Sequence, residues 1–108
     1  MKKKLIILIF LPTLILAQQS QKKIVASQFT VYGNCKMCKK TIEKAALSIR
    51  GVKMAKWYIP SNQLSLLYHT KKVELVNIHN AIAKSGYSTS ETMAKEEDYN
   101  KLPICCQY

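Results

Sequence analysis

Four cysteines are the residues of this 108-residue chain best suited to chemistry, and they come as two pairs. Cys35 and Cys38 are separated by two residues, whereas Cys105 and Cys106 are adjacent near the C-terminus. Deprotonated cysteine sulfur binds soft metal ions. The spacing of the first pair also occurs in zinc sites, in thiol–disulfide redox proteins and in plain disulfides. The first pair therefore predicts sulfur chemistry, and its place in the fold must decide which kind.

The first pair lies between a predicted strand and a predicted helix. Residues 27–32 alternate and are rich in β-branched and aromatic side chains, which indicates a strand ending at Gly33. Both sulfurs are thus expected near a helix N-terminus, where free backbone N–H groups favour negative charge. The lysines of that turn are expected to lower the thiol pKa values further. The helix is predicted from apolar residues at helical spacing before the stop signal of Gly51, namely Cys38, Ile42, Ala45, Ala46 and Ile49.

The rest of the chain predicts a hairpin, a second helix and a last strand. Alternation in residues 55–59 and 64–68, around turn-forming residues 60–63, predicts two paired strands. Residues 75–82 form an amphipathic helical pattern, and residues 87–92 are typical of a final strand. This order predicts an α+β, ferredoxin-like βαββαβ sandwich, in which both helices cover one face of a four-stranded antiparallel sheet.

The N-terminus has the layout of a secretory signal peptide. Three lysines precede an apolar run that ends at Ala17, and a polar string follows. A membrane-spanning helix needs about 20 apolar residues, whereas this run is shorter and contains Pro12. We therefore expect residues 1–17 to be cleaved and the protein to be exported to the periplasm or another extracytoplasmic space, with an N-terminal membrane anchor as the alternative. Residues 18–24 are predicted to be a flexible leader.

The chain is strongly basic, with 17 Lys and Arg residues against 6 Asp and Glu residues. Cleavage after residue 17 would remove three lysines and leave a formal net charge of +8. Export and the near absence of arginine argue against a nucleic-acid partner. Four lysines of the first helix either form a docking face for an acidic partner or are simply solvated; they are Lys36, Lys39, Lys40 and Lys44.

The residues around the first cysteine pair resemble those of the heavy-metal-associated domain family. The resemblance covers residues 25–92. Known members include copper chaperones, N-terminal domains of copper-pumping ATPases and exported mercury-scavenging proteins. It implies a ferredoxin-like fold, a metal ion held by Cys35 and Cys38, and transfer of that ion to a partner by ligand exchange. The residues that carry it are residues 31–38, Ile42, Gly51, Val52, Gly86 and Tyr87.

Two further residues enter the predicted site through this resemblance. Gly33 and Asn34 stand where the family usually has Met-Thr. Met37 therefore takes over the packing beneath the loop, is merely exposed, or offers a thioether to the ion. Tyr87 matches a tyrosine that lies near the metal loop of bacterial copper chaperones, which implies that it shields the ion. A core aromatic at the start of a strand is the alternative for Tyr87.

The second cysteine pair lies beyond the part that the family explains, in a predicted tail of residues 93–108. An exported protein with an even number of cysteines commonly forms disulfides, which is one interpretation of Cys105 and Cys106. Our hypothesis is that the acidic residues 96–98 are drawn to the lysine face. This would bring the second pair beside the first as additional metal ligands.

Other residues with tempting chemistry are interpreted as structural. His69 and His79 have no Cys, His, Asp or Glu neighbours at ligand spacing, so we expect them at the surface or its boundary. Trp57 alternates with apolar residues and is expected in the core.

The predicted function is the binding and transfer of a soft metal ion outside the cytoplasm. Cu(I) is preferred, with Hg(II) or Zn(II) as alternatives, and a metal transporter or efflux component at the membrane is the expected partner. Nothing in the chain resembles a set of catalytic residues, so no enzyme is expected. One alternative is a thiol–disulfide redox protein in which Cys35 attacks and Cys38 resolves. Another is a structural zinc site of all four cysteines. We expect a monomer, with a metal-bridged dimer as the alternative.

Overall fold

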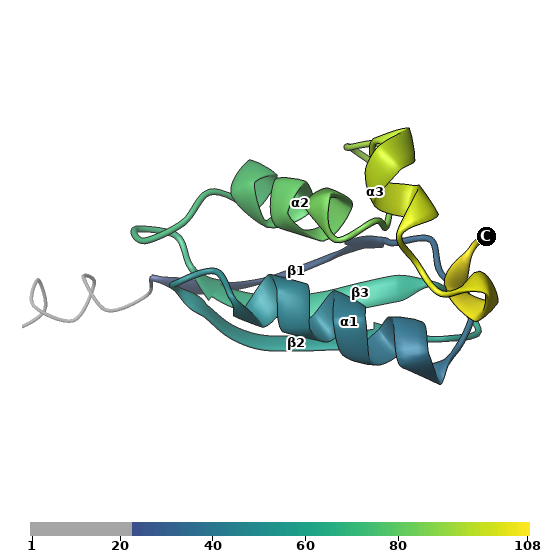
Figure 1. The fold of residues 1–108 in the computed structure, drawn as a ribbon. Coiled ribbons are helices and arrows are strands. Elements are labelled where there is room, and N and C mark those ends of the chain that lie inside the picture. The colour runs from purple at the N-terminus through teal and green to yellow at the C-terminus, as the bar shows by residue number, and fades with distance from the viewer. Residues whose placement is uncertain (1–22) are drawn as a thin grey trace, which may run out of the picture.

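The computed structural model describes residues 23–108, so the predicted signal peptide and most of the predicted leader lie outside the described residues. Among residues 23–108, no helix has both the length and the hydrophobicity needed to cross a membrane. The elements follow in the order β1 (Ile24–Thr30), α1 (Lys36–Leu47), β2 (Val52–Tyr58), β3 (Gln63–His69), α2 (Leu75–Lys84), α3 (Glu96–Asn100) and a short 3₁₀ turn, η2 (Ile104–Cys106) (Figure 1).

The described strands form an antiparallel sheet in the order β1-β3-β2. β1 begins at Ile24, before the predicted start at residue 27, because its first residues pair with the end of β3. In the central strand β3, side chains alternate between buried and half-buried, and Leu64, Leu66 and Tyr68 are the buried ones. Since alternate residues of a strand point to one face, β3 forms the base of the core.

The helices α1 and α2 cover this apolar face of the sheet and contact each other (Figure 1). α1 buries Cys38, Ile42 and Ala46, which lie four residues apart on one stripe of the helix. α2 contributes Ile78 and Ile82 to the same core. Each buried aliphatic side chain of this size contributes about 1.5–3 kcal/mol. The predicted arrangement of two helices on an antiparallel sheet is therefore confirmed.

The predicted fourth strand at residues 87–92 is wrong. This segment meets the edge of β1 only through an isolated antiparallel bridge between Val31 and Thr89. The Thr89 N–H donates to the Thr92 carbonyl (2.8 Å), and the Thr89 hydroxyl accepts hydrogen bonds from the N–H groups of Glu91 and Thr92 (3.1 and 3.0 Å). These local bonds close a turn that competes with the sheet ladder. The chain therefore leaves β1 after a single bridge.

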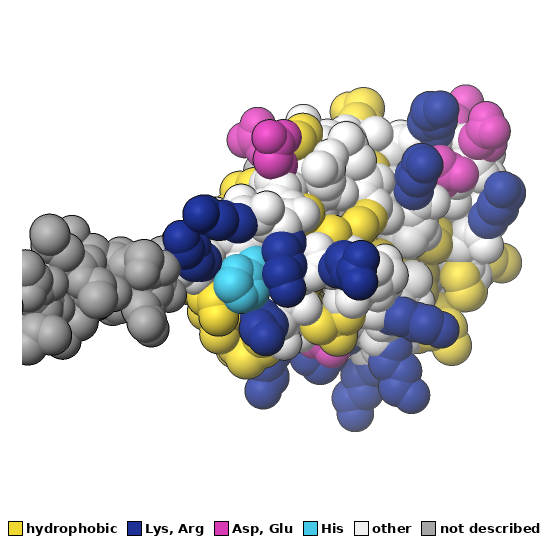
Figure 2. Space-filling model, turned by 90° about the vertical axis from the view of Figure 1, so that its left-hand side faces the viewer, with side chains coloured by type: hydrophobic (Ala, Val, Ile, Leu, Met, Phe, Trp, Pro, Cys, Tyr) yellow, Lys and Arg dark blue, Asp and Glu magenta, His cyan; other side chains and the backbone are white. Residues whose placement is uncertain are grey.

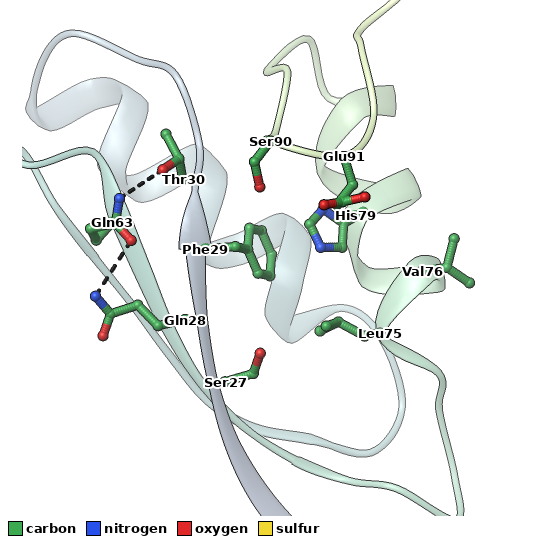
Figure 3. Close-up of a pocket in the computed structure, with 10 residues that line it drawn as sticks. All are labelled: Ser27, Gln28, Phe29, Thr30, Gln63, Leu75, Val76, His79, Ser90 and Glu91. Atoms are coloured by element: carbon green, nitrogen blue, oxygen red, sulfur yellow. Dashed lines mark hydrogen bonds between the residues drawn. The ribbon is translucent and has the colours of Figure 1, made fainter.

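A cavity of about 600 Å³ lies along the edge of β1 beside α2 (Figure 3). The His79 imidazole stacks on Phe29, with 3.8 Å between ring centroids, and its Nδ1 is 2.6 Å from the Thr89 hydroxyl. Burial lowers the pKa of His79, although the Glu91 carboxylate opposes this effect. His79 is thus a buried core histidine, and its expected place at the surface or boundary is wrong.

The C-terminal tail, residues 93–108, packs back onto the domain at the end where α1 begins (Figure 1). Leu102 and Cys106 are buried in the main core, at 8% and 0% exposure. The Tyr99 ring packs edge-on against Tyr108 (5.0 Å between centroids), and its hydroxyl donates to the Tyr108 carbonyl (2.6 Å). The Tyr108 hydroxyl in turn accepts from the Ser88 N–H (2.6 Å).

Packing rather than charge holds this tail in place. Among the described residues, no ion pair joins the acidic residues 96–98 to a lysine, and the salt bridge present is Lys39–Glu43 within α1. The expected attraction between the acidic segment and the lysine face is therefore wrong as the cause of docking. Exposed ion pairs contribute little in water, whereas the buried leucine and the tyrosine pair remove apolar surface from it.

Replacement of Gly86 is expected to disrupt the tail. Gly86 has φ +107°, and a Cβ there would lie 2.8 Å from Leu102 Cδ2 and 2.9 Å from the Asp98 carbonyl. We expect Gly86→Ala to lower the free energy of unfolding by about 1–2 kcal/mol, from the positive φ and the clash together. Urea unfolding of the reduced protein measures this. The exposed Ser90→Ala is the control, and equal stability of both variants would contradict the tail packing.

Candidate metal site

The cysteine loop, residues 33–38, follows β1 and includes the first residues of α1, and it lies against the ring of Trp57. Trp57 is buried, as expected, and its indole N–H donates to the Val31 carbonyl (3.0 Å). A Cβ at Gly33 would lie only 3.2 Å from the Trp57 ring and 3.3 Å from Cys38 Cβ. Packing of Met37 beneath the loop is therefore wrong, because Trp57 occupies that space and Met37 is 52% exposed.

The first cysteine pair lies at the N-terminus of α1, as the sequence predicts. Cys35 is the N-cap residue with extended backbone angles, and Cys38 is buried in the first turn. Their Sγ atoms are 3.5 Å apart, and the Asn34 N–H donates to the Cys38 sulfur (3.4 Å). All four cysteines are free thiols in the structure.

The tail brings the second cysteine pair to the first. The Cys35 sulfur lies 3.8 Å from the Cys106 sulfur and 4.0 Å from the Cys105 sulfur. The sulfurs of Cys35, Cys105 and Cys106 all lie within 4.8 Å of one another, with Cys106 buried and Cys105 exposed. Cysteines that are 70 and 71 positions apart in the sequence thus form one sulfur cluster.

Asn34 joins the cysteine loop to the tail and was missed as a functional residue. Its side-chain amide donates to the Gln107 carbonyl (3.0 Å) and, more weakly, to the Cys105 carbonyl (3.4 Å). The signal in the sequence was its departure from the usual Met-Thr pair, in a chain that also has an extra cysteine tail. Tyr99 and Tyr108, which hold the end of the tail, carried no such signal.

The two residues predicted around the site both border the cluster. The Met37 thioether lies 3.9 Å from the Cys105 sulfur on the exposed side. Tyr87 is fully buried and stacks on Tyr108, and its hydroxyl has no hydrogen-bond partner. Burial, the largest cause, raises the pKa of Tyr87, and the thiols of Cys106 and Cys38 raise it further. The hydroxyl therefore keeps its proton and is free to donate it to a sulfur.

Backbone groups make Cys35 the acidic thiol of the cluster. The backbone N–H of Cys38 is the main cause that lowers the Cys35 pKa to about 7, and the Cys38 thiol adds to it, while desolvation opposes them. The lysines expected to contribute are not among the causes. Lys39 instead contacts Glu43 and donates to the Trp57 carbonyl (3.0 Å). A helix N-terminus, not the lysine charge, thus favours the thiolate.

Cys106 has the opposite character. Burial raises the pKa of Cys106 to about 12, and hydrogen bonding to the Cys38 thiol adds to that rise. Near neutral pH the cluster therefore combines a partly ionised, half-buried sulfur at Cys35 with a protonated, buried one at Cys106.

Basic side chains are not confined to the cysteine end of the molecule. Figure 2 faces the end away from the C-terminus and shows Lys and Arg side chains spread over that surface as well. The docking role of the four α1 lysines remains a prediction.

Comparison with solved structures places this chain among small metal-handling domains. It matches a CopZ metallochaperone at 30% identity and a TM-score of 0.58, over 60% of this chain and 98% of that one. The chain belongs to the heavy-metal-associated domain family. This family recognition from the sequence is thereby confirmed. No family model and no curated protein matches the chain.

Two further solved structures resemble this heavy-metal-associated domain. The apo copper chaperone of Enterococcus hirae is 30% identical, with a TM-score of 0.54, over 57% of this chain and 93% of that one. The N-terminal domain of a potential copper-translocating P-type ATPase from Bacillus subtilis, in the Cu(I)-loaded state, is 26% identical, with a TM-score of 0.56, over 59% of this chain and 81% of that one. About two fifths of this chain thus has no counterpart in these proteins.

The ionisation of Cys35 predicts a selective, pH-dependent alkylation. Only the thiolate reacts with iodoacetamide, so reactivity at Cys35 should rise with a midpoint near pH 7, the value to which its pKa is lowered. Cys106 should stay unmodified at pH 8, because its pKa is raised to about 12. Peptide mapping of the reduced protein after timed labelling measures both. Cys35→Ser is the control, and a midpoint above pH 8.5 would contradict the described environment.

Proposed function

We propose that this domain binds one thiophilic ion, Cu(I) in preference to Hg(II) or Zn(II), between Cys35 and Cys38, and carries it to a membrane transporter. The observation that supports this best is the pair of free sulfurs 3.5 Å apart at the start of α1, in a member of the heavy-metal-associated family. We propose no catalytic step.

The two sulfurs have the properties that a transfer site needs. Cys35 is half-buried and has a pKa of about 7, so a thiolate is present near neutral pH and is accessible to an incoming ion. Cys38 is buried and accepts a hydrogen bond from the Asn34 N–H. One accessible, reactive ligand and one buried ligand let an ion arrive and leave by exchange of one sulfur at a time.

The donor set favours a soft ion. Thiolate sulfur is the preferred ligand of Cu(I), whereas zinc in structural sites takes four ligands in a closed tetrahedron. The group of mutually close potential ligands found in the described part of the chain consists of three thiols. The names of the E. hirae and B. subtilis proteins also point to copper.

Transfer requires ligand exchange without electron transfer. A thiolate of the partner forms a bond to the ion, and the bond from Cys35 or Cys38 then breaks, while the ion keeps its charge. The B. subtilis match is a domain of a copper-translocating ATPase, which supports a transporter of that class as the partner. We further propose, on the basis of its N-terminal sequence, that the protein acts outside the cytoplasm. The monomer remains an expectation.

Replacement of either loop cysteine should abolish tight binding of the ion when the tail cysteines are absent. We expect the purified, reduced chain to hold one Cu(I). In the Cys105→Ser/Cys106→Ser background, which leaves the loop pair as the cysteine ligands, Cys35→Ser and Cys38→Ser should each lose the ion in anaerobic titration against a Cu(I) chelator. Native mass spectrometry reports the stoichiometry, and parallel titrations with Zn(II) and Hg(II) rank the ions. The variant Ser48→Ala, on the exposed end of α1, is the control.

Two outcomes would reject this proposal. One is a chain that retains no Cu(I) or Hg(II) but cycles a Cys35–Cys38 disulfide and reduces a protein disulfide, which would support the redox alternative. The other is a single Zn(II) bound by four sulfurs, whose removal unfolds the chain.

A further inference from the structure

The sulfur cluster fits a three-coordinate ion better than a two-coordinate one. With metal–sulfur bonds of about 2.3 Å, two sulfurs on opposite sides of an ion lie about 4.6 Å apart, three in a plane about 4.0 Å apart, and four in a tetrahedron about 3.8 Å apart. Cys35 lies 4.0 Å from Cys105 and 3.8 Å from Cys106, and these three sulfurs all lie within 4.8 Å of one another. The two distances from Cys35 agree with the sulfur–sulfur separations around a three-coordinate ion and are shorter than that of a linear pair.

Cys38 is not one of these three sulfurs, although its thiol hydrogen-bonds to Cys106. It lies 3.5 Å from Cys35 but outside the set of three mutually close sulfurs. A linear site between Cys35 and Cys38 therefore needs these two sulfurs to separate by about 1 Å. Cys35 is the sulfur common to both arrangements.

We propose that Cys105 and Cys106 join Cys35 in a three-thiolate site that retains a soft ion, and that the tail must detach before the ion passes to a partner. This inference rests on the proposed function and adds a regulatory step to it. The ion is transferable when bound by Cys35 and Cys38, and retained when the tail sulfurs hold it. Tail closure forms metal–sulfur bonds to Cys105 and Cys106, releases their thiol protons to solvent, breaks the bond to Cys38 and transfers no electron.

Specific contacts hold the tail sulfurs beside the cysteine loop. Asn34 of the cysteine loop donates to two carbonyls of the tail, those of Cys105 and Gln107. Cys106 is fully buried in the main core, so its sulfur is held at a fixed place rather than on a free end.

A second observation points to a ligand at this place. The Tyr87 hydroxyl is fully buried and has no hydrogen-bond partner in the structure. Buried polar groups are normally paired, so an unpaired one calls for an explanation. After burial, the thiols of Cys106 and Cys38 are the neighbouring groups that raise the pKa of this hydroxyl. A thiolate formed at Cys106 on metal binding would give this hydroxyl the acceptor that it lacks.

The same geometry explains how the tail could be released. Its end is fastened by the Tyr99 hydroxyl, which donates to the Tyr108 carbonyl (2.6 Å), and by the Asn34 amide. Cys105 and Ile104 are exposed, so a partner can reach the tail from solvent. A partner that displaces the tail removes two sulfurs from the ion and returns it to the exchangeable pair.

The experiment compares Cu(I) binding by the wild-type chain and by the double variant Cys105→Ser/Cys106→Ser, reduced and anaerobic. X-ray absorption counts the sulfur ligands, chelator competition gives the affinity, and stopped-flow mixing with excess chelator gives the release rate. We expect three sulfurs in the wild type and two in the double variant. Tethered ligands strengthen binding by effective concentration, so the double variant should bind about 100-fold more weakly and release the ion faster.

Three further variants separate ligation from structural damage. Ile104→Ser changes an 87% exposed residue of the same turn and keeps every sulfur, so it should match the wild type. Cys105→Ser alone changes an exposed residue, does not threaten the core, and should still lower the sulfur count. Tyr99→Phe removes only the fastening hydroxyl, so it should speed release while three sulfurs remain bound.

The outcomes distinguish this inference from the proposed function. Two sulfurs in the wild type, or equal affinity and release rate in the wild type and the double variant, would overturn the three-thiolate site and leave the carrier intact. Four sulfurs in the wild type would overturn it in favour of a closed tetrahedral site. A wild-type chain that binds no soft ion would reject the proposed function itself.

Discussion

The buried indole of Trp57 is the contact on which the position of both cysteine pairs depends. Its side-chain N–H bonds to the Val31 carbonyl, its backbone N–H bonds to the Glu43 carboxylate (2.8 Å), and its ring fills the space beside Gly33. One residue thus joins β2 to the end of β1, to α1 and to the cysteine loop. The tail contacts that loop through Asn34, so the position of the tail also depends on Trp57.

The short contact between β1 and residue 89 makes the tail possible. A full fourth strand would run along β1 and carry the chain toward the opposite end of the sheet. Here the Thr89 turn ends the pairing after one bridge, and the following residues lead through α3 back to the start of α1 (Figure 1). As a result, one edge of β1 is unpaired over most of its length within residues 23–108, beside the cavity at His79 (Figure 3). The same path of the chain brings Cys105 and Cys106 close to Cys35.

The regular part of this fold was predictable from periodicity, because buried faces impose it. The alternation of β3 and the helical spacing of α1 and α2 were enough to place these elements within a few residues. The fourth strand was predicted wrongly because alternation cannot show that the Thr89 hydroxyl bonds to its own neighbours. Local side-chain bonds of this kind override a short apolar pattern.

The candidate site was predictable only in its first half. The spacing of Cys35 and Cys38, and their place before a helix, follow directly from the sequence. The approach of the second pair was predicted for the wrong reason, since charge was expected to cause what packing of Leu102 and the tyrosines does. Asn34, Tyr99 and Tyr108 act through contacts between distant residues, which no local pattern records.

Cys35 is the hub of the cluster, because its sulfur lies within 4.0 Å of each of the other three. Four sulfurs lie at one place, yet the Cys35 sulfur is a ligand in both arrangements proposed for the ion. Oxidants and alkylating agents also react readily with accessible thiols of lowered pKa, and Cys35 is such a thiol. Chemical modification of this one sulfur would therefore disable both arrangements. A bound ion, by occupying the lone pairs of Cys35, would protect the very sulfur on which its own retention and departure depend.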